Sequence, residues 1–199
     1  MPRDQITRRN VLKSLSIGAA AGSVLQTIPL QAAQYIHGLI EAEKSNAKAG
    51  GYLPKFFTAQ QYKTLKSLCE SILPADADSG GAVEAGAPEF IDQLTSENAE
   101  YQLSLGGGLM WLDSTCIDKY RKCYLDCALE QQTEILDRIA YRRNAVQEPG
   151  LSQGVEFFSI LRNLTSDGFF TSKIGIKYLG YIGNTFLMDF PGCPPVPGV

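Results

Sequence analysis

The amino-acid sequence predicts an all-α fold, built as a single irregular helical domain. Apolar residues recur at spacings of three and four along most of the chain, which is the period of a helix that buries one face. The sequence has no sustained alternation of β-branched and polar residues, the pattern of a half-buried strand. The 199 residues are 44% hydrophobic and 20% charged, so one domain has enough apolar material for a core.

Residues 1–33 have the features of a twin-arginine export signal. Arg8 and Arg9 are followed by Leu12 and Lys13 as in the export consensus, and an apolar stretch comes next. We therefore expect the twin-arginine translocase to recognise this segment and to export the chain to the periplasm. Proteins that use this route cross the membrane already folded, often with a partner or cofactor bound.

The sequence leaves the end of this signal open. The apolar stretch 15–25 is about half the ~20 residues that a membrane-spanning helix needs. A processing enzyme would cut after Ala32 or Ala33, yet neither has a small residue two positions before it.

Removing residues 1–33 takes away four basic side chains and one acidic, which moves the net charge from −3 to −6. A chain this acidic lacks the basic surface that nucleic-acid binding requires.

Residues 34–55 are polar and rich in Gly, Ala and Lys, and they predict a linker or loose helix that leads into a helical domain at 56–199. His37 lies in this segment, and we expect it to be exposed to solvent. It is the only histidine of the chain, so general-base catalysis, a Ser-His-Asp relay or a His-ligated metal would have to use it. The sequence therefore offers few residues for catalysis.

The first helix of the domain has clear boundaries. Thr58 and Gln61 have the spacing of a capping box, and Pro74 ends the helix after an apolar face. A Gly- and Asp-rich loop follows at 75–87. Pro88 suits the first turn of the next helix, where its missing N–H costs nothing.

The remaining helices are predicted from apolar periodicity. The longest region, 98–123, is interrupted by the glycines 106–108, each of which disfavours a helix by about 1 kcal/mol. These glycines indicate a kink or the close approach of another backbone. Shorter helices are predicted at 129–140, 157–164 and 174–181. The Pro-rich tail at 190–197 cannot continue a helix and should lie extended.

Five cysteines in an exported chain predict disulfides, because export leads to an oxidising compartment. Fifteen arrangements of two bridges exist, and the sequence selects none of them. Zinc and iron–sulfur sites commonly use Cys-x-x-Cys, which is absent, so no metal site is predicted. The disulfide candidates are Cys69, Cys116, Cys123, Cys127 and Cys193.

Motifs for autonomous catalysis are missing, and no catalytic residue is predicted. The sequence contains neither the Gly-x-Gly-x-x-Gly of dinucleotide-binding folds nor the Gly-x-Ser-x-Gly of hydrolases. The acid pairs Asp76/Asp78 and Asp126/Glu130 could serve as general acid and base in principle. Both lie among polar residues, so we expect them to be solvated.

A segment near the C-terminus mixes aromatic residues with glycines and small polar residues. One interpretation is a tightly packed internal turn, where glycine permits close approach of the backbone. The other is a surface that binds another protein, because aromatic residues are enriched in interface cores. The sequence leaves both open. The residues are Phe169, Phe170, Thr171, Ser172, Gly175 and Tyr181, together with Cys193 in the tail.

Several short motifs, in this order along the chain, resemble subunit 3 of gluconate 2-dehydrogenase. They follow the twin-arginine start and read Phe56-Phe57-Thr58, Ile72-Leu73-Pro74, Gly86-Ala87-Pro88-Glu89-Phe90-Ile91-Asp92, and Gly168-Phe169-Phe170-Thr171-Ser172 through Gly175 and Leu179-Gly180-Tyr181 to Gly192-Cys193. The resemblance implies a non-catalytic accessory subunit of a dehydrogenase that acts on sugars, glycosides or polyols. It further implies that a large subunit of the glucose–methanol–choline oxidoreductase type holds FAD and that this chain holds no cofactor.

The resemblance also implies partners and a location. A cytochrome c subunit often carries the electrons onward and links such complexes to the membrane. The large subunit commonly has no export signal, so the small subunit would bring it to the periplasm folded. Two alternatives stay open: a stand-alone, disulfide-stabilised periplasmic helical module that binds a ligand, and an electron carrier with a cysteine-ligated cluster.

Overall fold

The computed structural model of the chain describes residues 28–46 and 52–183. These residues are helical and contain no strand, which confirms the all-α prediction. Most of the predicted export signal and the Pro-rich tail lie outside the described residues. The helices are α2 (Leu30–Asn46), α3 (Ala59–Ile72), α4 (Ala87–Glu97), α5 (Ala99–Tyr101), a π-helix (Gln102–Gly106), α6 (Gly107–Tyr120), α7 (Leu129–Ile139), α8 (Arg142–Gln147), α9 (Ser152–Phe170) and α10 (Lys173–Tyr178).

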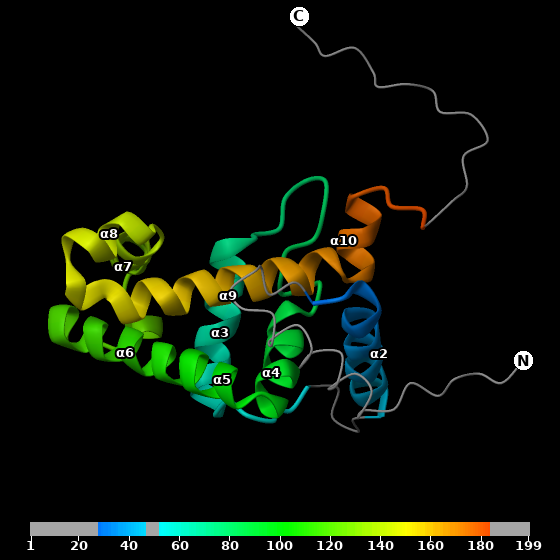
Figure 1. The fold of residues 1–199 in the computed structure, drawn as a ribbon, viewed down its shortest axis with the longest axis horizontal. Helices are drawn as coiled ribbons and strands as arrows, with labels where there is room; N and C mark the ends of the chain where they lie inside the picture. The colour runs from blue at the N-terminus through cyan, green and yellow to red at the C-terminus, as the bar shows by residue number, and fades with distance from the viewer. Residues whose placement is uncertain (1–27, 47–51, 184–199) are drawn as a thin grey trace, which may run out of the picture.

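Helix α9 is the centre of the fold. It runs along the long axis of the molecule with α6 beside it, and it contacts α3, α4, α7, α8 and α10 (Figure 1). Helices α7 and α8 lie at one end of the molecule, and α2 and α10 lie at the other (Figure 1). The core between them is apolar. Its largest fully buried side chains are Tyr124, Phe90, Phe157, Leu65, Leu68, Ile91, Leu105, Leu112, Ile135, Ile139 and Leu161.

The predicted helix starts are confirmed in α3 and α4. The Gln61 backbone N–H donates to Thr58 Oγ1 at 3.2 Å, and the Thr58 N–H donates to Gln61 Oε1 at 3.0 Å. This pair of bonds is the capping box, which satisfies backbone donors that have no partner inside the helix. Helix α4 begins with Pro88 in its first turn, after Gly86 in a left-handed conformation (φ 80°) that suits glycine.

The glycines 106–108 mark both a change of helix geometry and a close approach. The turn before them is a π-helix, a form that occurs mostly as a single-turn bulge within α-helices. A Cβ atom on Gly108 would lie 2.1 Å from Cδ2 of Phe157, which belongs to α9. Gly108 therefore allows α6 to pack closely against α9. The group that approaches it is the Phe157 side chain, and not the backbone of another segment.

For the segment 34–55 the sequence left a linker and a loose helix open, and in the structure residues up to Asn46 form α2, which packs on the core. Ala33, Ile36 and Ile40 are buried at 0–4% exposure on one face of this helix. Their spacing of three and four is the helical period, but polar residues between them lower the average hydrophobicity of the segment. The helix also begins at Leu30, inside the segment 1–33 that was predicted to be signal.

His37 is half-buried rather than exposed to solvent, and it connects α2 with α4 and with the turn after α9. Its ring stacks on Phe90 of α4, and its Nε2 lies 3.1 Å from Oγ1 of Thr171, which follows α9. The prediction of a solvent-exposed histidine was wrong because sequence neighbours gave no sign of these two distant contacts.

Candidate functional site

The aromatic and glycine-rich segment predicted as a candidate interface divides into buried and exposed residues. Phe169, Ser172 and Gly175 are buried. Ser172 Oγ donates to the Phe169 carbonyl at 2.7 Å and accepts from the Gly175 N–H at 3.1 Å, so it caps α10. A Cβ on Gly175 would lie 2.1 Å from the Phe169 carbonyl oxygen. These three residues therefore build the packed corner between α9 and α10.

Thr171 belongs to this corner as well. Its hydroxyl donates to the Asp167 carbonyl at 2.6 Å and lies 3.1 Å from the His37 ring nitrogen. Thr171 thus connects the corner to α2. Cys193, the remaining predicted member in the tail, lies outside the described residues.

Phe170 and Tyr181 are exposed, and three further apolar residues that we did not predict lie close to them in the sequence. Phe170 is 37% exposed and Tyr181 44%, and the others are Tyr178, Leu179 and Ile182. We call these five residues the C-terminal apolar surface. Phe170 also contacts the buried Phe169 edge to face, with ring centroids 5.1 Å apart. The five residues of the C-terminal apolar surface are visibly apolar in the sequence. Because α10 is so short, however, periodicity in the sequence cannot tell which of its residues are buried and which are exposed.

A second exposed apolar row lies on the π-helix and α6. Leu103, Met110 and Ile117 are 79%, 68% and 41% exposed, and Met110 and Ile117, seven residues apart within α6, lie along one side of that helix. Leu112 and Cys116 of the same helix occupy the core. The spacing of seven was the signal that could have identified this row.

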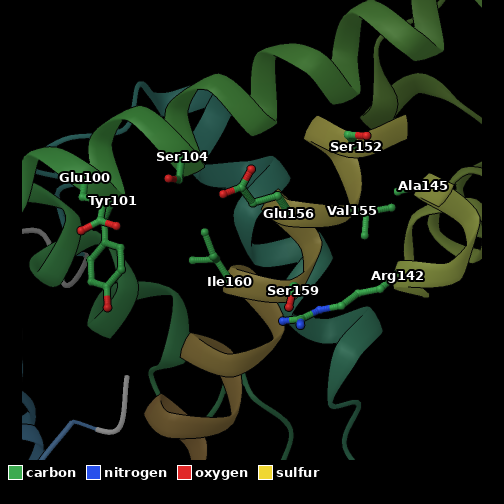
Figure 2. A pocket seen from close by; sticks show the side chains of 10 residues that line it. All are labelled: Glu100, Tyr101, Ser104, Arg142, Ala145, Ser152, Val155, Glu156, Ser159 and Ile160. Carbon is green, nitrogen blue, oxygen red and sulfur yellow. The ribbon is translucent and has the colours of Figure 1, made fainter. Parts of the chain in front are cut away.

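An open pocket of about 400 Å³ lies between α5, the π-helix, α8 and α9 (Figure 2). The Arg142 side chain reaches from α8 towards Ser159 on α9, and Glu100 and Glu156 lie elsewhere on the lining (Figure 2). These groups and the surrounding hydroxyls can hydrogen-bond a polar ligand. The lining, as the described residues define it, combines three serines, a tyrosine, an arginine and two glutamates with apolar side chains.

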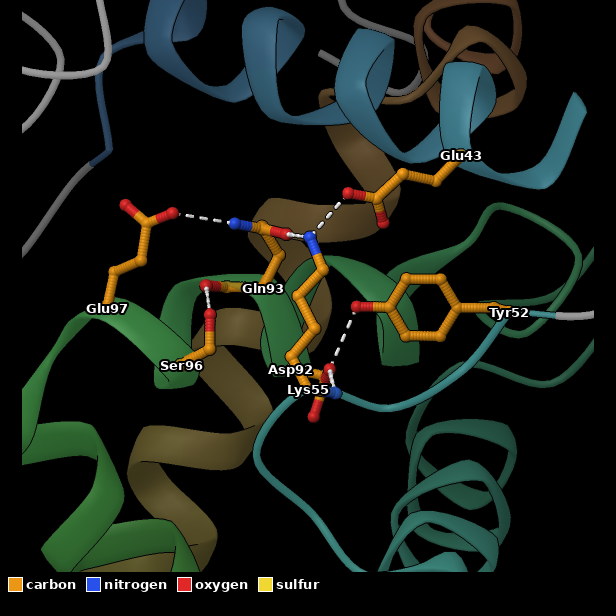
Figure 3. Close-up of polar contacts among 7 residues, drawn as sticks. All are labelled: Glu43, Tyr52, Lys55, Asp92, Gln93, Ser96 and Glu97. Atoms are coloured by element: carbon orange, nitrogen blue, oxygen red, sulfur yellow. Dashed lines mark hydrogen bonds and ion pairs between the residues drawn. The ribbon is translucent and has the colours of Figure 1, made fainter. Parts of the chain in front are cut away.

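Two carboxylates on α4, Glu89 and Asp92, are buried at 6% and 0% exposure, which the sequence did not predict. Asp92 accepts hydrogen bonds from the Tyr52 hydroxyl at 2.8 Å and from the backbone N–H groups of Lys55, Phe56 and Phe57 at 2.7–3.2 Å (Figure 3). A carboxylate satisfied by four donors is a structural group. It holds the segment before α3 against α4.

Glu89 is paired as well. Its Oε1 lies 2.8 Å from Lys44 Nζ, which comes from the last turn of α2. Burial, and after it the nearby Glu89 carboxylate, raise the pKa of the Tyr62 hydroxyl above its ordinary range. Both buried acids of α4 therefore fasten other segments to the core, and neither lines the pocket of Figure 2.

The four described cysteines are free thiols. Burial raises the pKa of Cys69 to about 12, and its thiol lies 3.6 Å from Thr165 Oγ1. Burial likewise raises the pKa of Cys116 to about 12, and the Cys127 thiol lies within hydrogen-bonding reach of it. Cys123 lies at the start of the loop that separates these two. The predicted disulfides thus stay a prediction, with Cys116 and Cys127 as neighbouring thiols.

Residues 28–46 and 52–183 contain neither a cluster of metal ligands nor a candidate membrane-spanning helix. No group of three or more His, Cys, Asp or Glu side chains in that part of the chain is placed to hold a metal ion. None of the helices there combines the length and hydropathy of a membrane-spanning segment.

Comparison with known proteins gives one match. The family model described as gluconate 2-dehydrogenase subunit 3 matches residues 59–192, which is most of the chain. No curated protein matches the chain, and no solved structure does. The matched range includes Asp92 and Glu89, the α9–α10 corner and the C-terminal apolar surface. The chain belongs to the gluconate 2-dehydrogenase subunit 3 family.

Proposed function

We propose that this chain is the non-catalytic small subunit of a periplasmic FAD-dependent dehydrogenase complex that acts on sugars, glycosides or gluconate. Membership of a family of third subunits implies a complex with other subunits. In the proposed complex, a large subunit of the glucose–methanol–choline oxidoreductase type holds FAD and removes hydride from a carbohydrate C–H bond. A cytochrome c subunit carries the electrons onward and associates the complex with the membrane.

The observation that carries this proposal is the C-terminal apolar surface. Leu179 is 58% exposed and Ile182 is 83% exposed, and three aromatic residues lie close to them in the sequence. Several large exposed apolar residues together are typical of a protein-binding surface, whereas single ones are not. Because tyrosine and phenylalanine are enriched in interface cores, we propose that the large subunit docks here.

Co-purification with the large subunit tests this docking. The double variant Leu179→Ser with Ile182→Ser removes apolar area from exposed positions, so the fold should remain. We expect the flavin absorbance that co-purifies with the tagged small subunit to fall at least about tenfold, which corresponds to about 1.4 kcal/mol of lost affinity. Val146→Ser is the matched control, since Val146 is 84% exposed on α8 at the other end of the molecule. Equal binding by both variants would refute docking at this surface.

We further propose that this subunit stabilises the large subunit and carries it through the twin-arginine translocase. The motif Arg8-Arg9 with Leu12 and Lys13 supports this role. The double variant Arg8→Lys with Arg9→Lys should leave both subunits in the cytoplasm, as immunoblots of the cell fractions would reveal. A large subunit that still reaches the periplasm would show that this chain is not its carrier.

The alternative is a stand-alone, disulfide-stabilised helical module that binds a ligand, and the pocket of Figure 2, with Arg142 and hydroxyl groups on its lining, favours it. The two functions differ in the behaviour of the isolated chain. An accessory subunit with an uncovered interface should associate or precipitate when produced alone. A monodisperse monomer, together with unchanged export of the large subunit after deletion of this chain, would favour the alternative.

A further inference from the structure

Helix α2 is fastened to the domain along its whole length. Its first turn is already closed, since the Ala33 N–H donates to the Pro29 carbonyl at 3.0 Å. Ala33 is fully buried and Ala32 is 7% exposed, and Ile36 and Ile40 continue this face into the core. The helix packs against α4, which lies within the range that the family model matches.

Polar contacts fasten the opposite end and the middle of α2. Lys44 pairs with the buried Glu89 of α4, and Glu41 pairs with Lys173 of α10 at 2.8 Å. His37 stacks on Phe90 and reaches Thr171. Glu43 pairs with Lys55 at 2.5 Å, just before α3 (Figure 3). Contacts with four separate parts of the domain make α2 a structural element of the folded protein.

The docked position of α2 would hinder cleavage at the peptide bonds where the sequence favours removal of the signal. Those bonds follow Ala32 and Ala33, in the first turn of α2. A peptidase hydrolyses a bond that lies extended in its active site, and so the helix would have to unwind and leave the core before cleavage. In the proposed export route, the processing enzyme meets the chain only after it has folded. The two alanines are then inaccessible.

We infer that α2 stays on the exported protein, and that processing of the folded chain cuts only before Ile28. Hydrolysis after Ala33 would leave a new N-terminus at Gln34 and remove the buried Ala33 with the Pro29 carbonyl that closes the first turn. This inference rests on the proposed export, whereas the protection of α2 rests on its packing alone. The two can therefore fail separately.

The first test is the N-terminus of the exported protein. The full chain with a tag after Val199 is purified from the periplasmic and membrane fractions, and its intact mass and N-terminal sequence are determined. We expect every species to begin at Ile28 or at an earlier residue. A species that begins at Pro29 or at any later residue would overturn the inference.

A matched pair of variants tests the cause. Ile36→Asp places a charge on the buried face of α2, and Ala42→Asp places the same charge on its exposed face. We expect the first variant to be cut after Ala32 or Ala33 and the second to remain uncut like the natural chain. Cleavage of both or of neither would show that docking of α2 does not control access to these bonds.

A chain that stays in the cytoplasm would contradict the proposed export but would still test α2. The purified full chain is then treated with elastase, which cuts after small residues such as alanine, and the fragments are weighed. We expect cutting after Ala32 and Ala33 to be at least about tenfold slower than in Ile36→Asp, because the folded helix must open first. Equal rates would overturn the inference whatever the location of the protein.

Discussion

The imidazole of His37 stacks on the ring of Phe90, with ring centroids 5.1 Å apart and an angle of 17° between the planes. The two residues belong to α2 and α4, and α3 lies between these helices in the sequence. The same imidazole reaches Thr171 beyond α9, so the only histidine of the chain lies where three distant segments meet.

Protonation of His37 should weaken the fold. Burial lowers its pKa below the ordinary 6.5, and although Glu41 opposes this shift, Lys44 adds to it. The unfolded chain therefore binds a proton at a higher pH than the folded chain does. The contribution of His37 to stability is complete above pH 6.5 and decreases as the pH falls below 6.5. Urea unfolding between pH 7.5 and pH 5.5 should show this decrease.

The His37→Phe variant is the control for this pH dependence. Phenylalanine can stack on Phe90 but has no titratable group, so the variant loses the bond to Thr171 and the decrease below pH 6.5 together. An equal decrease in the natural chain and in the variant would assign the pH dependence to other groups.

Replacement of Asp92 by Ala should be strongly destabilising. Three backbone N–H groups and the Tyr52 hydroxyl would lose their acceptor, and Asp92 itself is fully buried. Unsatisfied buried donors cost about 1–3 kcal/mol each, partly relieved by water, so we expect a loss of about 3 kcal/mol in urea unfolding. Asp118→Ala, at an exposed position of α6, should stay within about 0.5 kcal/mol of the natural chain.

Two glycine-to-alanine changes in helices should have opposite effects. On Gly108 the new methyl group would overlap Phe157, which we expect to cost about 1–3 kcal/mol. On Gly38 of α2 a Cβ meets nothing within 4 Å, so alanine should stabilise by about 0.5–1 kcal/mol through its higher helix propensity. Thermal unfolding of both variants checks the signs. Destabilisation by both would contradict the open space above Gly38.

Oxidation should join Cys116 to Cys127. Their thiols are neighbours at the end of α6 and the loop before α7. With oxidised glutathione, the two thiols give up two protons and two electrons, and the glutathione disulfide is reduced to two thiols. Because the pKa of Cys116 is raised to about 12, the reaction should be faster at pH 9 than at pH 7.

Peptide mapping of the Cys123→Ser variant identifies this bridge. Trypsin leaves Cys123 and Cys127 on one peptide, an ambiguity that the variant removes. It also leaves Cys69 and Cys116 on one peptide, which chymotrypsin then divides after Phe90, Tyr101 and Trp111. We expect the peptides with Cys116 and Cys127 to be linked after oxidation. A link from Cys69 instead, or five alkylated thiols in the denatured natural chain, would contradict this pairing.

The sequence predicted the helical fold and the boundaries that depend on local chemistry. The capping box at Thr58 is a contact between residues three apart, and Pro88 acts through its own ring, so both are readable without the rest of the chain. The order of short motifs likewise identified the family, which the match over residues 59–192 confirms.

Only the tertiary structure decided which faces of these helices are covered. Phe169 and Phe170 are adjacent and chemically identical, yet the first is 4% exposed and the second 37%. Their difference arises because α9 turns one side towards the core and the other outwards. In the same way, Ile36 is buried and His37 half-buried because α4 and Thr171 lie opposite α2. Burial depends on the segment that packs opposite a residue, and that segment comes from a distant part of the chain.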